Sequence, residues 1–176
     1  GGVGSAVVRA LVAAGGKVVA EDLDPAVGAL ASDDVAVVVG DVAEESTAED
    51  AVATAVGRFG ALTGLVNNAA RFNMSPISET GADLWDALMR TNVRGAFLHI
   101  KAAEDALAES RGAVVNTGSM SGLIGMPGQI LYGATKGAVH QLTRMAAIEL
   151  APKGIRGNAV APGHIETGFM DDLLPP

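Results

Sequence analysis

The first 22 residues, GGVGSAVVRALVAAGGKVVAED, hold a turn, a helix and a strand in succession, and this order decides the fold. A glycine-rich turn over residues 1–4 leads into a helical pattern over residues 3–14, which the glycine pair at 15–16 ends. Residues 17–22 form a short apolar run that ends on an acid, as a buried strand does. A helix followed directly by a buried strand is typical of domains in which helices cover a parallel sheet.

The alternation of apolar runs and helical patterns continues to residue 160. The Val-rich, nearly continuous strands predict a parallel sheet with helices on both faces, a Rossmann-type doubly wound α/β fold. With no linker or repeat in view, we expect a single domain over residues 1–176. A capping box of Ser46 and Glu49 is expected to open one helix. The further expected strands span residues 35–42, 62–67, 113–117 and 155–160, and the expected helices span residues 25–31, 46–59, 82–108 and 131–150.

Composition and charge narrow the function classes. Twelve Lys and Arg against twenty Asp and Glu give a net charge of -8, which disfavours binding to nucleic acid. The sequence holds no cysteine, and His99, His140 and His164 lack metal-ligand spacing, so we expect no disulfide and no metal site. No apolar run approaches the ~20 residues of a membrane span, and we expect a cytoplasmic protein with no membrane partner. Because the first residue is Gly rather than Met, we expect the sequence to begin inside a longer chain.

The glycine-rich turn and the acid after the next strand predict a dinucleotide site. Gly2 and Gly4 let the main chain approach a pyrophosphate, which the helix N-terminus then stabilises. Asp22 follows the last glycine of the turn by about 20 residues. An acid at that distance binds the ribose hydroxyls and repels a 2′-phosphate, so Asp22 favours NAD over NADP. Each feature alone has a plainer interpretation, namely a structural turn and a solvated carboxylate. A methyltransferase that binds S-adenosylmethionine also uses such a turn, and this alternative stays open.

Four side chains downstream predict acid/base chemistry. Tyr132 and Lys136 are four residues apart, so on a helix they share one face, and an ammonium beside a phenol lowers its pKa from about 10. A tyrosine tuned in this way serves as a general acid/base near neutral pH. Ser119 follows the strand at 113–117, where a hydroxyl can hold a substrate carbonyl. Asn92 lies inside an expected helix, and either a functional contact or a local bond to the main chain explains it there.

Taken together, these segments resemble the short-chain dehydrogenase/reductase family from Gly2 to Thr167. The motifs that carry the resemblance are GGVG at the start, NNAA at 67–70, TNVRG around Asn92, NTGSMSG around Ser119, YGATK from Tyr132 to Lys136, and NAVAPGHIET at 158–167. The resemblance implies Asn92, Ser119, Tyr132 and Lys136 as catalytic residues. It implies a cofactor site of Gly2, Val3, Gly4, Asp22, Leu23, Asp41, Val42, Asn68, Tyr132, Lys136, Ile165 and Thr167.

The implied reaction is hydride transfer between NAD(H) and a secondary alcohol or ketone. Tyr132 exchanges the hydroxyl proton, Lys136 lowers the Tyr132 pKa and binds the nicotinamide ribose, and Ser119 holds the substrate oxygen. Asn92 is implied to keep a water that links Lys136 to solvent. The substrate stays open among sugars, 3-oxoacyl thioesters, steroids and small diols. A catalytically silent dinucleotide-binding or scaffold relative of the same fold is the remaining alternative.

The resemblance also implies a homo-oligomer, in particular a homotetramer formed through the two long helices at 82–108 and 131–150. The second of these helices carries more apolar residues than one half-buried face requires. The plainer interpretation is that they only face the sheet. These apolar residues are Ala138, Val139, Leu142, Met145, Ala146 and Leu150.

Departures from the family pattern are few. Ala70 replaces a usual Gly and Gly118 replaces a frequent Ser, and we expect both small residues to be tolerated. The larger departure concerns the family's strand order 3-2-1-4-5-6. Its first strand would precede residue 1, and its last helix and strand would follow Pro176. We therefore expect a domain that is incomplete at both ends and lacks a central strand between those ending at Asp22 and Asn67.

Overall fold

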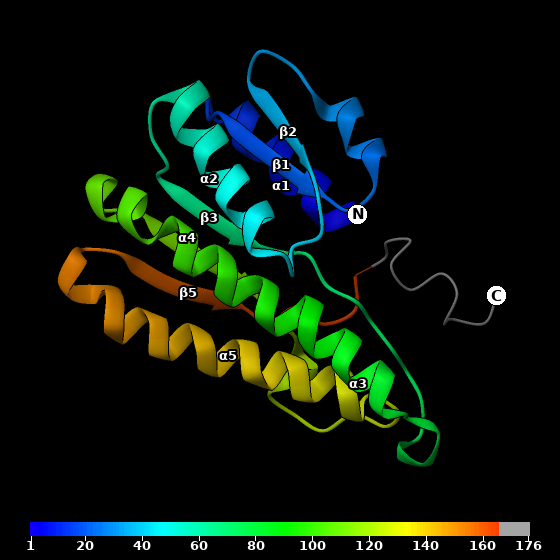
Figure 1. Cartoon of the computed structure of the whole chain (residues 1–176). Helices are drawn as coiled ribbons and strands as arrows, with labels where there is room; N and C mark the ends of the chain where they lie inside the picture. The colour runs from blue at the N-terminus through cyan, green and yellow to red at the C-terminus, as the bar shows by residue number, and fades with distance from the viewer. Residues whose placement is uncertain (166–176) are drawn as a thin grey trace.

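The computed structural model describes residues 1–165, and over this range five strands and the helices between them alternate along the chain (Figure 1). No helix in this range is both long and apolar enough to cross a bilayer. The elements are α1 (Gly2–Ala13), β1 (Val18–Asp22), η1 (Pro25–Leu30), β2 (Val35–Val39), α2 (Glu45–Phe59), β3 (Gly64–Asn67), η2 (Ile77–Glu79), α3 (Ala82–Met89), η3 (Arg90–Arg94), α4 (Gly95–Ser110), β4 (Ala113–Thr117), η4 (Met120–Gly122), α5 (Ile130–Leu150), η5 (Ala151–Lys153) and β5 (Arg156–Val160).

All strand pairings among the described residues are parallel. β2 pairs with β1, and β3, β4 and β5 form a second sheet in that order. Within residues 1–165, β1 and β3 are not hydrogen-bonded to each other, and a cavity lined by both strands separates them. The spatial order is the one expected, with one position open between β1 and β3.

Helices cover both faces of the strands, which confirms the predicted Rossmann-type α/β class. Figure 1 shows α1 behind β1, and α2 and α4 in front of the strands. The side chains that join α4, β4 and α5 are small or medium aliphatic residues, so a sequence with few aromatics still packs closely. This core consists of Ile100, Ala103, Leu107, Val114, Leu150 and Ile155.

The long helix expected over residues 82–108 is confirmed, and it contains one wider turn. The regular turns of α3 end at Met89, and the five residues Arg90–Arg94 form a wider π-helical turn before α4 begins at Gly95. Such turns are often found at functional sites. The sequence did not predict this wider turn, at which Asn92 bonds to the main chain of Arg71 and to the side chain of Thr135.

The expected capping box at Ser46 is also wrong. α2 begins at Glu45, its N-cap is Glu44, and the N-cap makes no side-chain bond. The preceding turn is held by Asp41, whose Oδ1 accepts the N–H of Ala43 at 2.9 Å and whose carbonyl accepts the N–H of Glu44 at 2.9 Å. Because this turn already directs the chain into the helix, the helix starts before Ser46.

Candidate active site

One cavity of ≈ 1140 Å³ gathers the residues that the sequence singled out. It opens at the carboxyl ends of the strands and extends between β1 and β3. Thr167 lies outside the described residues. The predicted residues that line the cavity are Gly2, Val3, Gly4, Asp22, Leu23, Asp41, Val42, Asn68, Asn92, Ser119, Tyr132, Lys136 and Ile165.

Asn92 is 3% exposed and bonds to two distant segments. Its Oδ1 accepts the N–H of Arg71 at 2.7 Å, and its Nδ2 donates to the carbonyl of Arg71 at 2.9 Å. The same Nδ2 donates to Thr135 Oγ1 on α5 at 2.9 Å. The alternative of a local bond to its own helix is therefore excluded. Asn92 fixes the loop after β3 against the helix that carries Tyr132.

Ser119 lies at the turn that follows β4. Its main chain is extended, and its Oγ accepts the N–H of Ser121 at 3.2 Å. The side chain of Ser119 lies close enough to the Tyr132 phenol to act on its pKa, which it lowers. The serine hydroxyl and the phenol therefore face the same region of the cavity.

Tyr132 and Lys136 share one face of α5, as their spacing predicts. The Tyr132 ring packs edge-to-face against Phe72, with ring centroids 4.7 Å apart. Lys136 Nζ lies 5.7 Å from the centre of the Tyr132 ring and donates to the carbonyl of Thr117 at 2.6 Å. Tyr132 is 8% exposed and Lys136 is 3% exposed, so both are held in fixed positions.

The expectation that Lys136 lowers the Tyr132 pKa is wrong for this structure. Burial raises the pKa of Tyr132, and hydrogen bonding with the Ser119 side chain offsets only part of this effect. Burial also lowers the pKa of Lys136 to about 8, because the ammonium has lost its water. The ammonium is directed to the Thr117 carbonyl and lies over the phenol ring, so it does not act on the phenol oxygen as the sequence argument assumed.

The expected glycine-rich turn forms the first turn of α1, where Gly4 approaches the segment after β3. A Cβ at Gly4 would lie 3.0 Å from Asn68 Nδ2, so the Asn68 side chain would have to shift slightly to accept it. Asp22 ends β1 and also lines the cavity, and its Oδ1 accepts the N–H of Asp24 at 3.1 Å. Its carboxylate is 40% exposed and remains accessible to a ligand.

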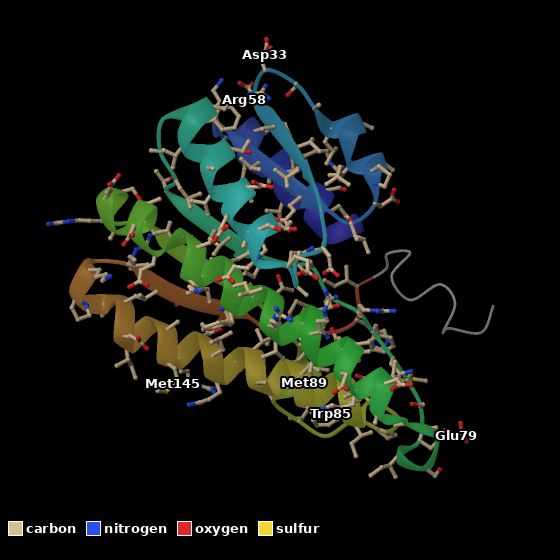
Figure 2. The ribbon with its side chains drawn as sticks, viewed as in Figure 1. Asp33, Arg58, Glu79, Trp85, Met89 and Met145 are labelled. Carbon is tan, nitrogen blue, oxygen red and sulfur yellow. The ribbon has the colours of Figure 1, made fainter. Side chains whose placement is uncertain are left out.

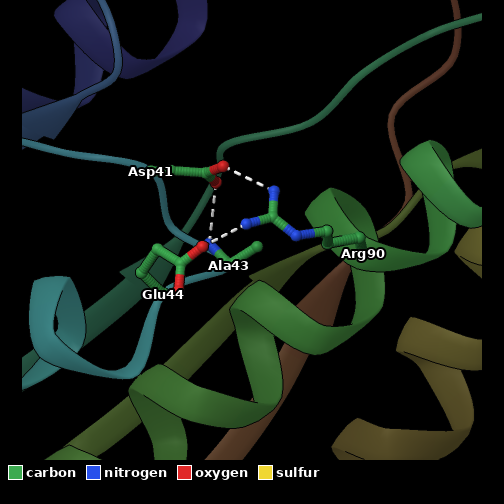
Figure 3. A network of polar contacts seen from close by, with 4 residues as sticks. All are labelled: Asp41, Ala43, Glu44 and Arg90. Atoms are coloured by element: carbon green, nitrogen blue, oxygen red, sulfur yellow. Dashed lines mark hydrogen bonds and ion pairs between the residues drawn. The ribbon is translucent and has the colours of Figure 1, made fainter.

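The loop that carries Asp41 is tied to η3 by an arginine (Figure 3). Arg90 Nη1 donates to Asp41 Oδ2 at 2.6 Å, and Arg90 Nη2 pairs with Glu44. The Ala43 N–H and the Arg90 guanidinium hold the pKa of the Asp41 carboxyl below its usual range. Gly95 permits a close approach, since a Cβ there would meet Val42 Cγ2 at 2.9 Å. The loop that carries Asp41 and the turn with Asn92 are therefore linked by direct contacts.

Sequence reasoning missed Arg90, Thr135 and His140. Arg90 and Thr135 hold predicted residues in place from other elements, and no local pattern marks them. From the sequence, His140 was noted only for its lack of metal-ligand spacing, and the structure buries it with its Nε2 against the main chain of Ser119. Its spacing of four residues from Lys136 is the signal that was available.

Residues 1–174 match the family model described as enoyl-(acyl carrier protein) reductase. Inactive 2-(S)-hydroxypropyl-CoM dehydrogenase 2 of Xanthobacter autotrophicus is 41% identical over 171 residues, which cover 94% of this chain and 74% of the relative. The chain belongs to the short-chain dehydrogenase/reductase family. A curated 2-(S)-hydroxypropyl-CoM dehydrogenase 3 from the same organism is 39% identical, over 98% of this chain and 71% of the relative.

Solved structures agree with this membership of the short-chain dehydrogenase/reductase family. NAD⁺-bound xylitol dehydrogenase superposes with a TM-score of 0.81 and is 33% identical over 86% of this chain. ElxO with NADP bound superposes with a TM-score of 0.78 and is also 33% identical, over 88% of this chain. The chain spans 62% and 66% of those two structures. The family's chemistry is nicotinamide-linked oxidoreduction at CH–OH groups, and a nicotinamide dinucleotide is the cofactor that the comparisons support.

Proposed function

We propose that this chain is the main part of an NAD-dependent dehydrogenase that acts on a small secondary alcohol or ketone. The observation that carries the proposal is the convergence of Asn92, Ser119, Tyr132 and Lys136, all buried, on one cavity beside the glycine-rich turn. These side chains come from three separate elements, so their convergence is not a property of one helix. The methyltransferase alternative accounts for the turn but for none of the four.

The protein residues would supply binding, orientation and proton transfer. Gly2–Gly4 open helix α1 at the edge of the cavity, and the main-chain N–H groups of a helix N-terminus would bind a pyrophosphate. A bound nicotinamide would supply the hydride acceptor or donor at its C4 atom. In the reductive direction the neutral Tyr132 phenol, the form that burial favours, would donate its proton to the substrate oxygen that Ser119 holds. In the oxidative direction the phenol would first give up its own proton, and the resulting phenolate would take the hydroxyl proton of the substrate. Lys136, with a pKa of about 8, can relay that proton onward.

NAD rather than NADP is the proposed cofactor. Asp22 keeps an accessible carboxylate at the end of β1, and residues 20–31 contain no Lys or Arg that could pair with a 2′-phosphate. A carboxylate beside that phosphate is repulsive. Because the related structures include both an NAD⁺-bound and an NADP-bound protein, this choice rests on Asp22.

The proposed assembly is a homotetramer in the cytoplasm. Of the apolar residues expected on α5, Val139 and Leu150 are buried and Leu142 packs on the core, so the plainer interpretation holds for them. Apolar side chains still project outward, and Figure 2 shows Trp85 and Met145 at the edge formed by α3 and α5. The large exposed apolar residues on α3, α4 and α5 are Trp85, Phe97, Ile130, Met145 and Ile148. Light scattering at micromolar concentration tests this assembly, and a monomer would contradict it.

A further strand is proposed to fill the space between β1 and β3. Both strands present unpaired main-chain groups to the cavity, and the walls there are apolar. A strand parallel to both would join the two sheets into one. This proposal keeps the prediction of a single domain that is incomplete in residues 1–176.

A direct test is to screen the full-length protein against alcohols and ketones with NAD⁺ or NADH, and to follow NADH absorbance. We expect turnover with at least one sugar, hydroxysteroid, diol or 3-oxoacyl thioester. Binding of NADH without any turnover would favour the catalytically silent alternative, which the inactive relative makes worth testing. Failure to bind either dinucleotide would contradict the proposal entirely.

A further inference from the structure

α5 places a row of polar side chains against the end of β4. Thr143 Oγ1 accepts from Asn116 Nδ2 at 2.8 Å, and Lys136 Nζ donates to the carbonyl of Thr117 at 2.6 Å. Between them on the helix, His140 Nε2 lies 3.0 Å from the Ser119 carbonyl oxygen and 3.4 Å from its nitrogen. Spacings of three and four residues keep these groups on one face of the helix. The end of β4 and the turn after it are therefore anchored to α5 at successive positions.

The His140 ring occupies the space above Gly118. A Cβ at Gly118 would lie 2.5 Å from His140 Nε2, which is too close for any side chain. His140 is 7% exposed, so the ring has little room to move away. Gly118, noted above as a departure from the family's frequent Ser, is thus required by the imidazole beside it.

We propose that His140 is a positioning residue, which together with Gly118 fixes the main chain of Ser119 so that its hydroxyl stays directed at Tyr132. The inference rests on the proposed function, because that function gives Ser119 its role. The Nε2–H tautomer donates to the Ser119 carbonyl, and the other tautomer accepts the Ser119 N–H. Either bond constrains the residue that presents the hydroxyl, and a buried imidazole needs such a partner to offset its lost hydration.

The test replaces the imidazole with side chains of similar size in the full-length protein. His140→Met fills the space without a hydrogen bond, whereas His140→Gln places an amide nitrogen near the position of Nε2. Misplacement of a catalytic group by about 1 Å can lower the reaction rate ~10²-fold. We therefore expect the smaller displacement in His140→Met to lower kcat about tenfold. KM for NAD should stay within about twofold, since the dinucleotide site is untouched. His140→Gln should restore most of kcat.

A second readout needs no substrate. Tyr132 is the single tyrosine of the 176 residues, and a difference spectrum against Tyr132→Phe isolates its phenolate absorbance in the longer chain. The Ser119 side chain lowers the pKa of Tyr132, and Lys136 is the charged group that lies over the ring. His140→Met should therefore raise the titration midpoint of Tyr132, and His140→Gln should return it towards wild type. An unchanged midpoint and an unchanged kcat in a folded His140→Met protein would show that His140 only fills space.

Two controls keep the outcomes distinct. If no compound is turned over by the wild type, the proposed function fails, and the Tyr132 titration still decides the role of His140. If the His140→Met protein does not fold, the His140→Asn protein takes its place in the test. The asparagine amide is polar, but it is too short to reach the Ser119 carbonyl. A His140→Asn protein that matched His140→Gln in kcat and in the titration would overturn the proposal.

Discussion

The two halves of the molecule hold their functional side chains in different ways. On the side of β3, β4 and β5, Asn92, Ser119, Tyr132 and Lys136 are buried, and hydrogen bonds link them to neighbouring elements. On the side of β1 and β2, helix α1 has no buried residue, and the Asp22 carboxylate is 40% exposed. The side of β3, β4 and β5 is thus the proposed catalytic half, held by hydrogen bonds within the protein, and the side of β1 and β2 is the proposed nucleotide-binding half, which borders the open space between β1 and β3.

A contact between a histidine and a carboxylate links these two halves. His99 Nε2 on α4 lies 2.8 Å from Glu21 Oε2 on β1, and His99 Nδ1 bonds to the Gly95 carbonyl at 2.9 Å. The second carboxylate oxygen of Glu21 is buried and has no hydrogen-bond partner among residues 1–165. An unpartnered buried oxygen is costly, and here it borders the open position between β1 and β3. This oxygen of Glu21 is thus a buried polar atom without a hydrogen-bond partner, within residues 1–165, in the proposed nucleotide-binding half.

The largest expected effect comes from leaving the space between β1 and β3 unfilled. Residues 1–176 expressed alone should show no cooperative melt and no NAD-linked turnover, because two strands expose unpaired edges and a domain's net stability is only about 5–15 kcal/mol. The measurement is a thermal melt followed by circular dichroism, beside the full-length protein. A cooperative melt with turnover by residues 1–176 would show that the two halves are equally complete.

The next effect concerns the buried ammonium of Lys136. Burial lowers its pKa to about 8 from 10.5, so the folded state binds fewer protons than the unfolded state between these values, and stability rises with pH there. Relative to Lys136→Met, the full-length protein should gain on the order of 2–3 kcal/mol of unfolding free energy between pH 7 and pH 10.5. Urea titrations of both proteins across this range measure the difference. A constant difference would mean that Lys136 is well hydrated and the catalytic half less closely packed than described.

A smaller effect is expected at Asp22 in the nucleotide-binding half. Asp22→Ala should reduce the preference for NAD over NADP, measured as the ratio of kcat/KM values, by about tenfold, or ~1.4 kcal/mol of lost repulsion. Asp33→Ala is the matched control, because that exposed acid lies at a loop tip away from the cavity (Figure 2). Equal use of both cofactors by the wild type would refute the assignment of Asp22.

The sequence predicted the features that depend on residues close together in the chain. It missed the features that depend on contacts between elements far apart in the chain. Tyr132 and Lys136 were predictable because one helix turn relates them, and Asp22 because it ends a strand. The π-helical turn at Asn92 was not, since it accompanies partners on two other segments. The pairing of Gly118 with His140 likewise requires β4 and α5 to be in contact. The direction of the Tyr132 pKa was missed because burial, which spacing does not reveal, raises it, and the group that lowers it is Ser119 rather than Lys136.

The most direct test of the central claim is kcat for Tyr132→Phe in the full-length protein, measured with a substrate that the wild type oxidises. Phe keeps the ring that packs on Phe72 and removes the transferable proton. We predict a loss of about 10²–10⁴-fold in kcat, the usual value of general acid/base catalysis, with NADH affinity close to that of the wild type. A Tyr132→Phe protein with near wild-type kcat would contradict the account, because another group would then carry the proton.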